Sequence, residues 1–271
     1  MPTTKKKTKK RPKRPTKKRR DTQRKIIISV FALVLVAVLG ITGIAVSHTG
    51  RKLPNPLVGL DKDKAYGVDI SHHNGKVNWK TLKNEVDFAI IRVGYRGYQN
   101  GAVCIDKNAK KNLRAANDAG IPVGVYFYTQ AVNEEEAREE ARACLDIIKK
   151  YDISLPVFYD FEYPTSNGKH TGRLFEAGLT KKENSRLINA FCTEIEDAGY
   201  QSGVYASSFM YKSNFKMSEL DKSIYIWVAD YNPSVTYNGD YDLWQFSDKG
   251  QVNGVKKKVD ENYWYIKNQG E

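Results

Sequence analysis

The chain has 271 residues, of which 44 are lysine or arginine and 31 are acidic, giving a net charge of +13. A sequence pI of about 9.4 is often typical of nucleic-acid binding. However, residues 1–25 hold fourteen of the basic side chains and one acid, Asp21, so the rest of the chain is neutral overall. Nucleic acid is therefore excluded as a partner of the remainder.

Residues 26–46 contain no charged side chain. A helix of this length would be roughly 31 Å long, enough to cross the hydrocarbon core of a bilayer. We therefore predict a single-pass transmembrane helix in the cell membrane, with a basic cytoplasmic tail over residues 1–25 and an extracellular domain after it. The tail would also attract anionic membrane lipid. A cleaved signal peptide is the alternative, because Gly43 and Ala45 are small residues at a suitable spacing, although its apolar core would span only about 7–15 residues.

Residues 47–64 combine glycine, proline and mixed charge, which predicts a linker. Residues 65–267 then form one domain, long enough to bury a substantial core. Its three cysteines, Cys104, Cys144 and Cys192, are not an even set with the spacing of a disulfide framework. We expect buried apolar thiols instead.

The domain alternates short apolar runs with helical patterns, which implies parallel strands joined by crossover helices. The eight candidate strands are residues 66–70, 88–93, 123–128, 156–160, 203–206, 224–229, 243–246 and a short piece around Val259. Eight strands suggest a closed barrel, but about 200 residues is short for an eightfold one, and the final strands leave no room for helices. The expected fold is α/β, a modified (β/α) barrel whose last third lacks its helices, preceded by the single transmembrane helix.

The helices of the domain have recognisable starts. Asp106 can cap a helix that ends at Gly120. Two more starts are predicted by capping-box spacing, at Asn133 with Glu136 and at Thr180 with Glu183. Acids between residues 134 and 140, together with Arg138 and Arg142, predict a solvated helix face with ion pairs four residues apart.

The run 157–162 (VFYDFE) ends in two carboxylates. Side chains alternate along a strand, so Asp160 and Glu162 should point to one side and Phe161 to the other. Repulsion between neighbouring acids raises the pKa of one and leaves the other ionised, as a general acid beside an anionic helper requires. We expect Glu162 to stay protonated and Asp160 to stay ionised. An isolated pair of this kind is more often a solvated strand end.

Other polar residues should converge with this pair, because parallel β/α folds carry their chemistry at the carboxyl ends of the strands. Such positions are held by Asp69, Asp230 and Gln245, with Asp260 after the last strand. Large aromatic side chains near strand ends suit a sugar groove, since a flat ring with a polar tip fits a pyranose face. The predicted substrate-binding residues are these aromatic side chains together with two of the polar ones: Tyr95, Tyr128, Tyr163, Trp227, Asp230, Trp244 and Gln245.

Four segments in this order resemble the family 25 glycoside hydrolases, the lysozymes (N-acetylmuramidases) of bacteria and their phages. They are VDISHHNG at 68–75, DFE at 160–162, WQF at 244–246 and VDEN at 259–262, and they extend over nearly the whole domain. The resemblance implies a modified β/α barrel that cleaves the β-1,4 bond between N-acetylmuramic acid and N-acetylglucosamine in peptidoglycan glycan strands. It also implies Glu162 as the general acid, with Asp160, Asp69 and Asp260 placed around the scissile bond.

Residue chemistry agrees with that reaction. Glycoside cleavage needs an acid for the leaving oxygen and negative charge near the oxocarbenium-like transition state. A substrate with a 2-acetamido group can supply its own nucleophile while an enzyme carboxylate orients it, and the resemblance favours this role for Asp160. A non-catalytic module that binds wall glycan is the alternative function, and a scaffold with a basic recruiting tail is a third; intact Glu162 and Asp160 argue against the module.

Other catalytic classes find no support in the sequence, and no cofactor or metal is expected. His72 and His73 are adjacent, so on an extended segment they would point apart, and no distant ligand cluster accompanies them. Ser71 lacks the glycine-flanked turn of a serine hydrolase. Cys104 falls in a predicted loop without a partner base.

Overall fold

The computed structural model describes residues 57, 60 and 63–266. The predicted basic tail and transmembrane helix, residues 1–46, lie outside the described residues, as does most of the predicted linker. Among the residues that are described, no helix combines the length and the apolar character needed to cross a bilayer.

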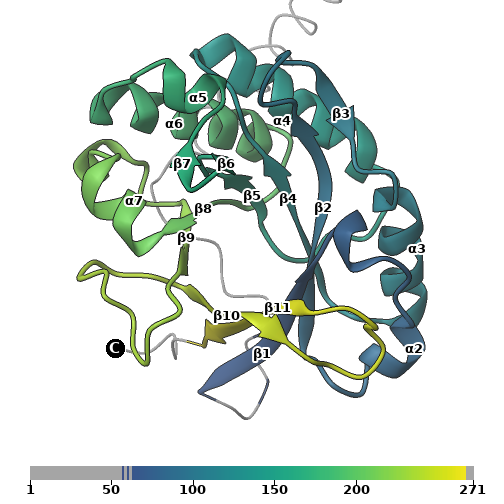
Figure 1. Cartoon of the computed structure of the whole chain (residues 1–271). Coiled ribbons are helices and arrows are strands. Elements are labelled where there is room, and N and C mark those ends of the chain that lie inside the picture. The colour runs from purple at the N-terminus through teal and green to yellow at the C-terminus, as the bar shows by residue number, and fades with distance from the viewer. Residues whose placement is uncertain (1–56, 58–59, 61–62, 267–271) are drawn as a thin grey trace, which may run out of the picture. The chain divides into compact units, whose positions relative to one another are not determined.

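Eight strands form a closed barrel, each matching a strand predicted from the sequence (Figure 1). Their bounds are β1 Lys64–Ile70, β2 Phe88–Arg96, β4 Val123–Tyr128, β5 Val157–Asp160, β8 Ser202–Ser207, β9 Tyr225–Ala229, β10 Leu243–Gly250 and β11 Val259–Tyr265. The ring closes because β1 pairs with both β2 and β11. Three short strands were not predicted: β3 (Val103–Ile105), which extends the sheet beside β2, and the hairpin of β6 (Thr165–Ser166) and β7 (Lys169–His170).

The direction of β11 differs from the all-parallel pairing expected from strand–helix alternation. The pairs from β1 through β2, β4, β5, β8 and β9 to β10 are parallel, whereas β11 is antiparallel to both β10 and β1. Residues 251–258 join β10 to β11, a connection too short for a parallel crossover. Consequently the start of β11 lies beside the carboxyl ends of the other strands, and Asp260 stands opposite Asp69.

Helices cover the outside of most of the barrel (Figure 1). Their bounds are α2 Trp79–Leu82, α3 Ala109–Ala119, α4 Glu134–Ile148, α5 Arg173–Glu176, α6 Lys181–Asp197 and α7 Ser208–Ser213, with 3-10 turns η1 His72–Asn74 and η2 Met217–Glu219. In the described part of the chain no helix follows β9, as expected from the close spacing of the last strands.

Two of the three predicted helix starts are confirmed. Thr180 and Glu183 form a capping box at the start of α6, and the Asn133 side chain accepts a hydrogen bond from the Glu136 N–H at the start of α4. The third is wrong, because α3 begins at Ala109 and Asp106 does not cap it. The Asp106 carboxylate instead accepts hydrogen bonds from Arg92 and from the backbone of His72.

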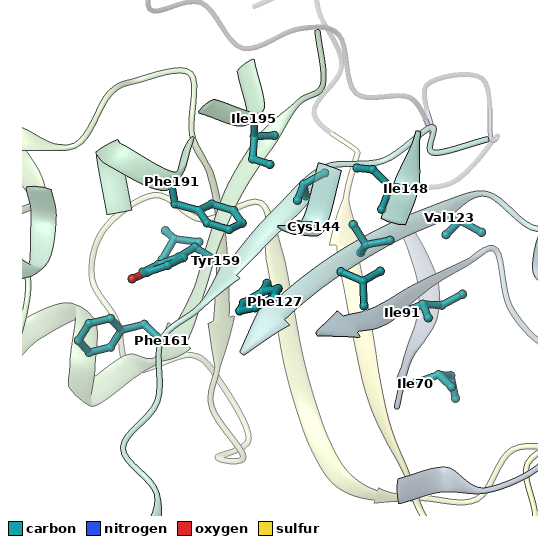
Figure 2. Packing of buried hydrophobic residues seen from close by; sticks show 14 of the residues in the cluster. Ile70, Ile91, Val123, Phe127, Cys144, Ile148, Tyr159, Phe161, Phe191 and Ile195 are labelled. Carbon is teal, nitrogen blue, oxygen red and sulfur yellow. The ribbon is translucent and has the colours of Figure 1, made fainter. Parts of the chain in front are cut away.

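The core has two layers. Inside the barrel, Phe158 and Phe88 make edge contacts with Trp227 and Trp264, with ring centroids 5.0 and 5.6 Å apart. The second layer lies between the strands and the helices α4 and α6 (Figure 2). Figure 2 shows this second layer with side chains from strands and helices, among them Phe127, Tyr159, Cys144, Ile148 and Phe191.

The cysteines of the domain are all free thiols. Cys144 and Cys192 are buried in α4 and α6, as expected. Burial raises the pKa of both thiols. Cys104 lies in β3 and not in the predicted loop.

One acid of α4 departs from the predicted solvated face. Glu134 pairs with Arg138 at the surface, but Glu140 is fully buried against the barrel. Its carboxylate accepts hydrogen bonds of 2.7 Å from Arg96 Nε and from the Thr129 hydroxyl. Burial raises the pKa of Glu140 to about 7, although both hydrogen bonds act to lower it.

We expect Arg96→Met to lower the free energy of unfolding by about 3–5 kcal/mol, because it leaves the buried Glu140 carboxylate without its cation. The loss should be larger at pH 8 than at pH 5. A carboxyl whose pKa is raised by folding stabilises the native state below its unfolded pKa, and in the unmodified protein that contribution is lost as the pH rises through about 7. Without Arg96 the pKa of Glu140 rises further, so the variant continues to lose stability at higher pH. Urea unfolding at the two pH values measures the effect. Arg142→Met, on the exposed face of α4, should change little, and equal losses in the two variants would contradict the prediction.

Candidate active site

A groove of about 640 Å³ opens where the parallel strands end, and it contains all four acids predicted to act in catalysis. Asp69 and Asp160 lie at the ends of β1 and β5, Glu162 lies two residues beyond β5, and Asp260 lies near the start of β11. The remaining walls are formed by polar and aromatic side chains: Ser71, His72, His73, Asn74, Arg92, Tyr95, Tyr98, Tyr126, Tyr128, Pro164, Tyr205, Trp227, Tyr231 and Gln245.

The alternation predicted for the D-x-E segment is present. Asp160 and Glu162 line the groove, whereas Phe161 is fully buried in the layer beneath the helices. Asp160 is buried with 4% of its surface exposed, and its Oδ1 atom has no hydrogen-bond partner among the described residues. A buried polar atom without a hydrogen bond lowers the stability of the fold, and a ligand that forms this hydrogen bond would remove the cost.

Both carboxyls of this pair are held toward their protonated forms. Burial, followed by the negative charge of Glu162, raises the pKa of Asp160 well above its usual range. Burial also raises the pKa of Glu162, and a hydrogen bond from Tyr205 works in the opposite direction. Both acids are thus shifted toward their protonated forms, which differs from the expectation of an ionised Asp160 beside a protonated Glu162.

A second pair of acids faces across the strands β1 and β11. Asp69 Oδ2 accepts hydrogen bonds of 2.9 Å from Gln245 Nε2 and from Asn262 Nδ2. Burial raises the pKa of Asp69, and these two bonds act to lower it. Asp260 has a pKa raised to about 9 by burial and by the facing Asp69 carboxylate. Near neutral pH, Asp260 therefore carries a proton that it donates to Asp69.

The proton on Asp260 predicts a pH dependence. As the pH rises through about 9, Asp260 loses this proton and two carboxylates face each other, so kcat/KM should fall. In Asp260→Asn the amide donates at every pH, and this alkaline limb should disappear or move upward. The measurement is kcat/KM between pH 5 and 10. Asp152→Asn, at an exposed position, is the control; an unchanged limb in Asp260→Asn would assign it to another group.

Gln245 connects the two halves of the groove. Its Oε1 atom accepts hydrogen bonds from the hydroxyls of Tyr205 and Tyr231, at 2.8 and 2.7 Å, while its Nε2 atom donates to Asp69. Because every polar atom of the amide is used, the orientation of the side chain is fixed. Gln245 thus holds Asp69 in place and positions two phenol groups on the groove wall.

Of the seven residues predicted to bind substrate, the structure brings four to the groove: Tyr95, Tyr128, Trp227 and Gln245. The other three lie outside its lining. Tyr163 packs against Phe175 and accepts a hydrogen bond from Asn214. Trp244 donates its indole N–H to the backbone oxygen of Asp230.

The Asp230 carboxylate forms its hydrogen bonds within the domain and not toward the groove. It accepts hydrogen bonds from Ser208 and from the backbone and hydroxyl of Thr236. Burial alone would raise the pKa of Asp230, but these bonds lower it below its usual range. Asp230 therefore fixes the loop after β9 and does not reach the groove.

The structure adds groove residues that the sequence reasoning did not select. Arg92 lies in β2 and pairs with Asp106 at 3.0 Å, and its positive charge lowers the pKa of both Asp160 and Glu162. The available signal was a charged residue, Arg92, inside the apolar run at residues 88–93. Tyr231, directly after β9, is the second addition and had no distinguishing pattern.

His72 and His73 do not point apart as predicted. They lie on the 3-10 turn η1 and their ring centroids are 4.0 Å apart. His72 Nδ1 lies 2.8 Å from Asp106 Oδ2 and 2.6 Å from Arg92 Nη2. Across the described residues no group of His, Cys, Asp or Glu is arranged to hold a metal ion.

A barrel that gathers carboxyl pairs and aromatic side chains in an open groove has the groups that glycoside hydrolysis requires. Residues 68–255 match the model of the glycosyl hydrolases family 25. The chain therefore belongs to this family.

Individual relatives are similar over the same domain. An autolytic lysozyme of Clostridium acetobutylicum is 24% identical over 195 residues, covering 72% of this chain and 54% of that protein. The modular autolysin LytC of Streptococcus pneumoniae, solved in complex with a synthetic peptidoglycan ligand, has a TM-score of 0.63 and 30% identity, covering 79% of this chain and 50% of the other. The present chain thus spans about half the length of each.

The fold is also shared with a family 25 glycosyl hydrolase of Bacillus anthracis. The TM-score is 0.61 at 21% identity, covering 76% of this chain and 91% of the other. At this identity the likeness shows the barrel and no more.

Proposed function

We propose that this domain hydrolyses the β-1,4 bond between N-acetylmuramic acid and N-acetylglucosamine in peptidoglycan. The observation that carries the proposal is the shared groove position of Glu162 and Asp160, with the buried Oδ1 of Asp160 left unpartnered. Support also comes from family membership, from a relative named an autolytic lysozyme and from a related autolysin solved with a peptidoglycan ligand.

In the proposed reaction Glu162 donates its proton to the glycosidic oxygen as the bond to the leaving sugar breaks. The open Oδ1 atom of Asp160 binds the 2-acetamido N–H and orients the acetamido oxygen, which bonds to the anomeric carbon as the glycosidic bond breaks. Water, deprotonated by the Glu162 carboxylate, then attacks the anomeric carbon, breaks the bond to the acetamido oxygen and leaves the new reducing end. The raised pKa of Glu162 favours the protonated form from which this donation starts. Tyr128 and Trp227 on the groove wall provide apolar surface for the sugar rings.

The test is to incubate the full chain, in detergent, with purified peptidoglycan and to analyse the released fragments by mass spectrometry. New reducing ends on muramic acid are expected. Reducing ends on glucosamine would overturn the bond assignment. Binding to the wall without any new reducing end would favour the non-catalytic glycan-binding module.

We further propose that residues 26–46 anchor the domain to the outer side of the cell membrane. The support is the uncharged run itself and the fourteen basic residues before it. Protease added to wall-stripped cells should remove the domain and leave a small membrane-bound fragment that contains Met1. A secreted protein beginning near Val46 or Ser47 would instead establish a cleaved signal peptide, and the hydrolase proposal would be unaffected.

A further inference from the structure

A second hollow, of about 1230 Å³, lies on the side of the barrel and plays no part in the proposed reaction. Its walls come from the segment around α2, from the end of α3 and from the loop between β10 and β11, which extends towards α2 in Figure 1. We call it the lysine cleft, because five of its lining residues are lysines: Lys76, Lys80, Lys256, Lys257 and Lys258.

The positive charge of the lysine cleft is largely unneutralised. Asp118 is the one acid in its lining. Lys76, Lys80, Lys256 and Lys258 are exposed, and within residues 63–266 none of them forms an ion pair with a carboxylate. Other exposed lysines of the domain, such as Lys149 and Lys216, do form such pairs.

The two lysine-bearing segments are held together by the backbone. Val77 and Val255 form an antiparallel bridge, and the Asn78 N–H donates to the Gly254 oxygen at 2.8 Å. Gly254 has a φ of +98°, and a Cβ there would lie 2.8 Å from the Asn78 oxygen, so only glycine permits this approach. The shape of the lysine cleft is therefore fixed by backbone contacts between its two segments.

The lysine cleft adjoins the catalytic groove through one loop. Lys257 Nζ donates to the His73 oxygen at 2.8 Å, and Asn74 Nδ2 donates to the Lys258 oxygen at 3.0 Å. His73 and Asn74 both line the groove, whereas Lys257 and Lys258 line the cleft. The cleft and the groove therefore share this loop as a common wall.

We infer that the lysine cleft binds the carboxylates of the peptides that peptidoglycan carries on its muramic acid residues. The inference rests on the proposed function, which places a glycan strand in the groove. Stem peptides carry several free carboxylates, and unpaired ammonium groups attract them. The exposed amide side chain of Gln251, also in the lining, suits a peptide backbone.

The test compares peptide-bearing glycan with the same glycan after its peptides have been removed. In the triple variant Lys76→Ala/Lys256→Ala/Lys258→Ala, KM for the peptide-bearing glycan should rise about tenfold with kcat unchanged, since exposed ion pairs are individually weak and act together. On peptide-free glycan the variant and the unmodified protein should agree. Lys257 is left in place because it also contacts the groove wall.

The matched control removes the same charge elsewhere, in Lys149→Ala/Lys150→Ala/Lys222→Ala, whose three positions are exposed and line neither hollow. An equal rise of KM in both triple variants would reflect net charge alone and would overturn the inference. An unchanged KM in the cleft variant would also overturn it.

A binding experiment separates this inference from the proposed reaction. In a Glu162→Gln background, fluorescence anisotropy gives the Kd for labelled peptide-bearing and peptide-free glycan without turnover. The cleft substitutions should weaken only the first, by about tenfold. If no reducing ends on muramic acid are released, the proposed hydrolysis is overturned. The Kd measurement still tests whether the lysine cleft binds the peptides. If the substitutions weaken binding of poly(glycerol phosphate) and leave the peptide-bearing glycan unaffected, the cleft binds phosphodiesters and the inference is overturned.

Discussion

Replacing Glu162 by glutamine is expected to lower kcat on peptidoglycan by about 10²–10⁴-fold while the protein folds normally. Glutamine has the shape of glutamate but cannot donate a proton to the glycosidic oxygen. Glu162 lies partly exposed at the groove, so the fold does not depend on its charge. The measurement is the rate at which muramic acid reducing ends appear, with the melting temperature recorded alongside.

The matched control is Glu194→Gln, on the outer helix α6, which should retain full activity. A Glu162→Gln variant that kept more than about a tenth of the rate would contradict the role of Glu162 as general acid. Loss of activity with an equal loss of folded protein would point to a structural role.

Replacing Asp160 by asparagine is expected to lower kcat by about 10²-fold or more, because a carboxyl preorganised against the acetamido group acts where charge develops. The role in orienting the acetamido group makes a sharper prediction. On glycan whose N-acetyl groups have been removed, the unmodified protein should be slow and Asp160→Asn should be no slower.

A control variant and a second substrate test the role of Asp160 in orienting the acetamido group. Asp248→Asn, at an exposed position on β10, should match the unmodified protein on both substrates. A further 10²-fold loss in Asp160→Asn on the de-N-acetylated glycan would show that Asp160 stabilises the transition state directly and does not act through the acetamido group.

The strand plan of the barrel could be predicted because each strand is an apolar run with polar residues beyond it. The D-x-E segment shows the same logic, since alternation along β5 places Asp160 and Glu162 in the groove and Phe161 in the core. These features depend on neighbours in sequence, and local pattern is sufficient for them.

Features that depend on distant contacts could not be predicted in this way. No local sequence pattern shows that the Asp230 carboxylate accepts hydrogen bonds from Ser208 and Thr236, or that Arg92 pairs with Asp106. The burial of Glu140 could have been predicted in part from the sequence. Glu140 shares one face of α4 with Ala137, Ala141 and Cys144, and this helical spacing indicates a buried position.

The antiparallel β11 also left a usable signal. Only residues 251–258 separate it from β10, and a connection of that length favours an antiparallel neighbour. The expectation of parallel strands throughout came from the alternating first part of the domain. The close spacing of the last strands predicted the missing helices, and the same short connection also favours an antiparallel β11.

The pairing of β1 with β11 has a consequence for how the domain becomes active. Lys64 lies opposite Tyr265, so the ring is sealed by contacts between the two ends of the barrel segment. Contacts so distant in sequence form slowly, because a long loop must close before they are made. Asp69, Asp260 and Asn262 meet across the pairing of β1 with β11. In a partly folded domain these two acids are therefore not brought into the groove together. The proposed activity should therefore appear only once the barrel has closed.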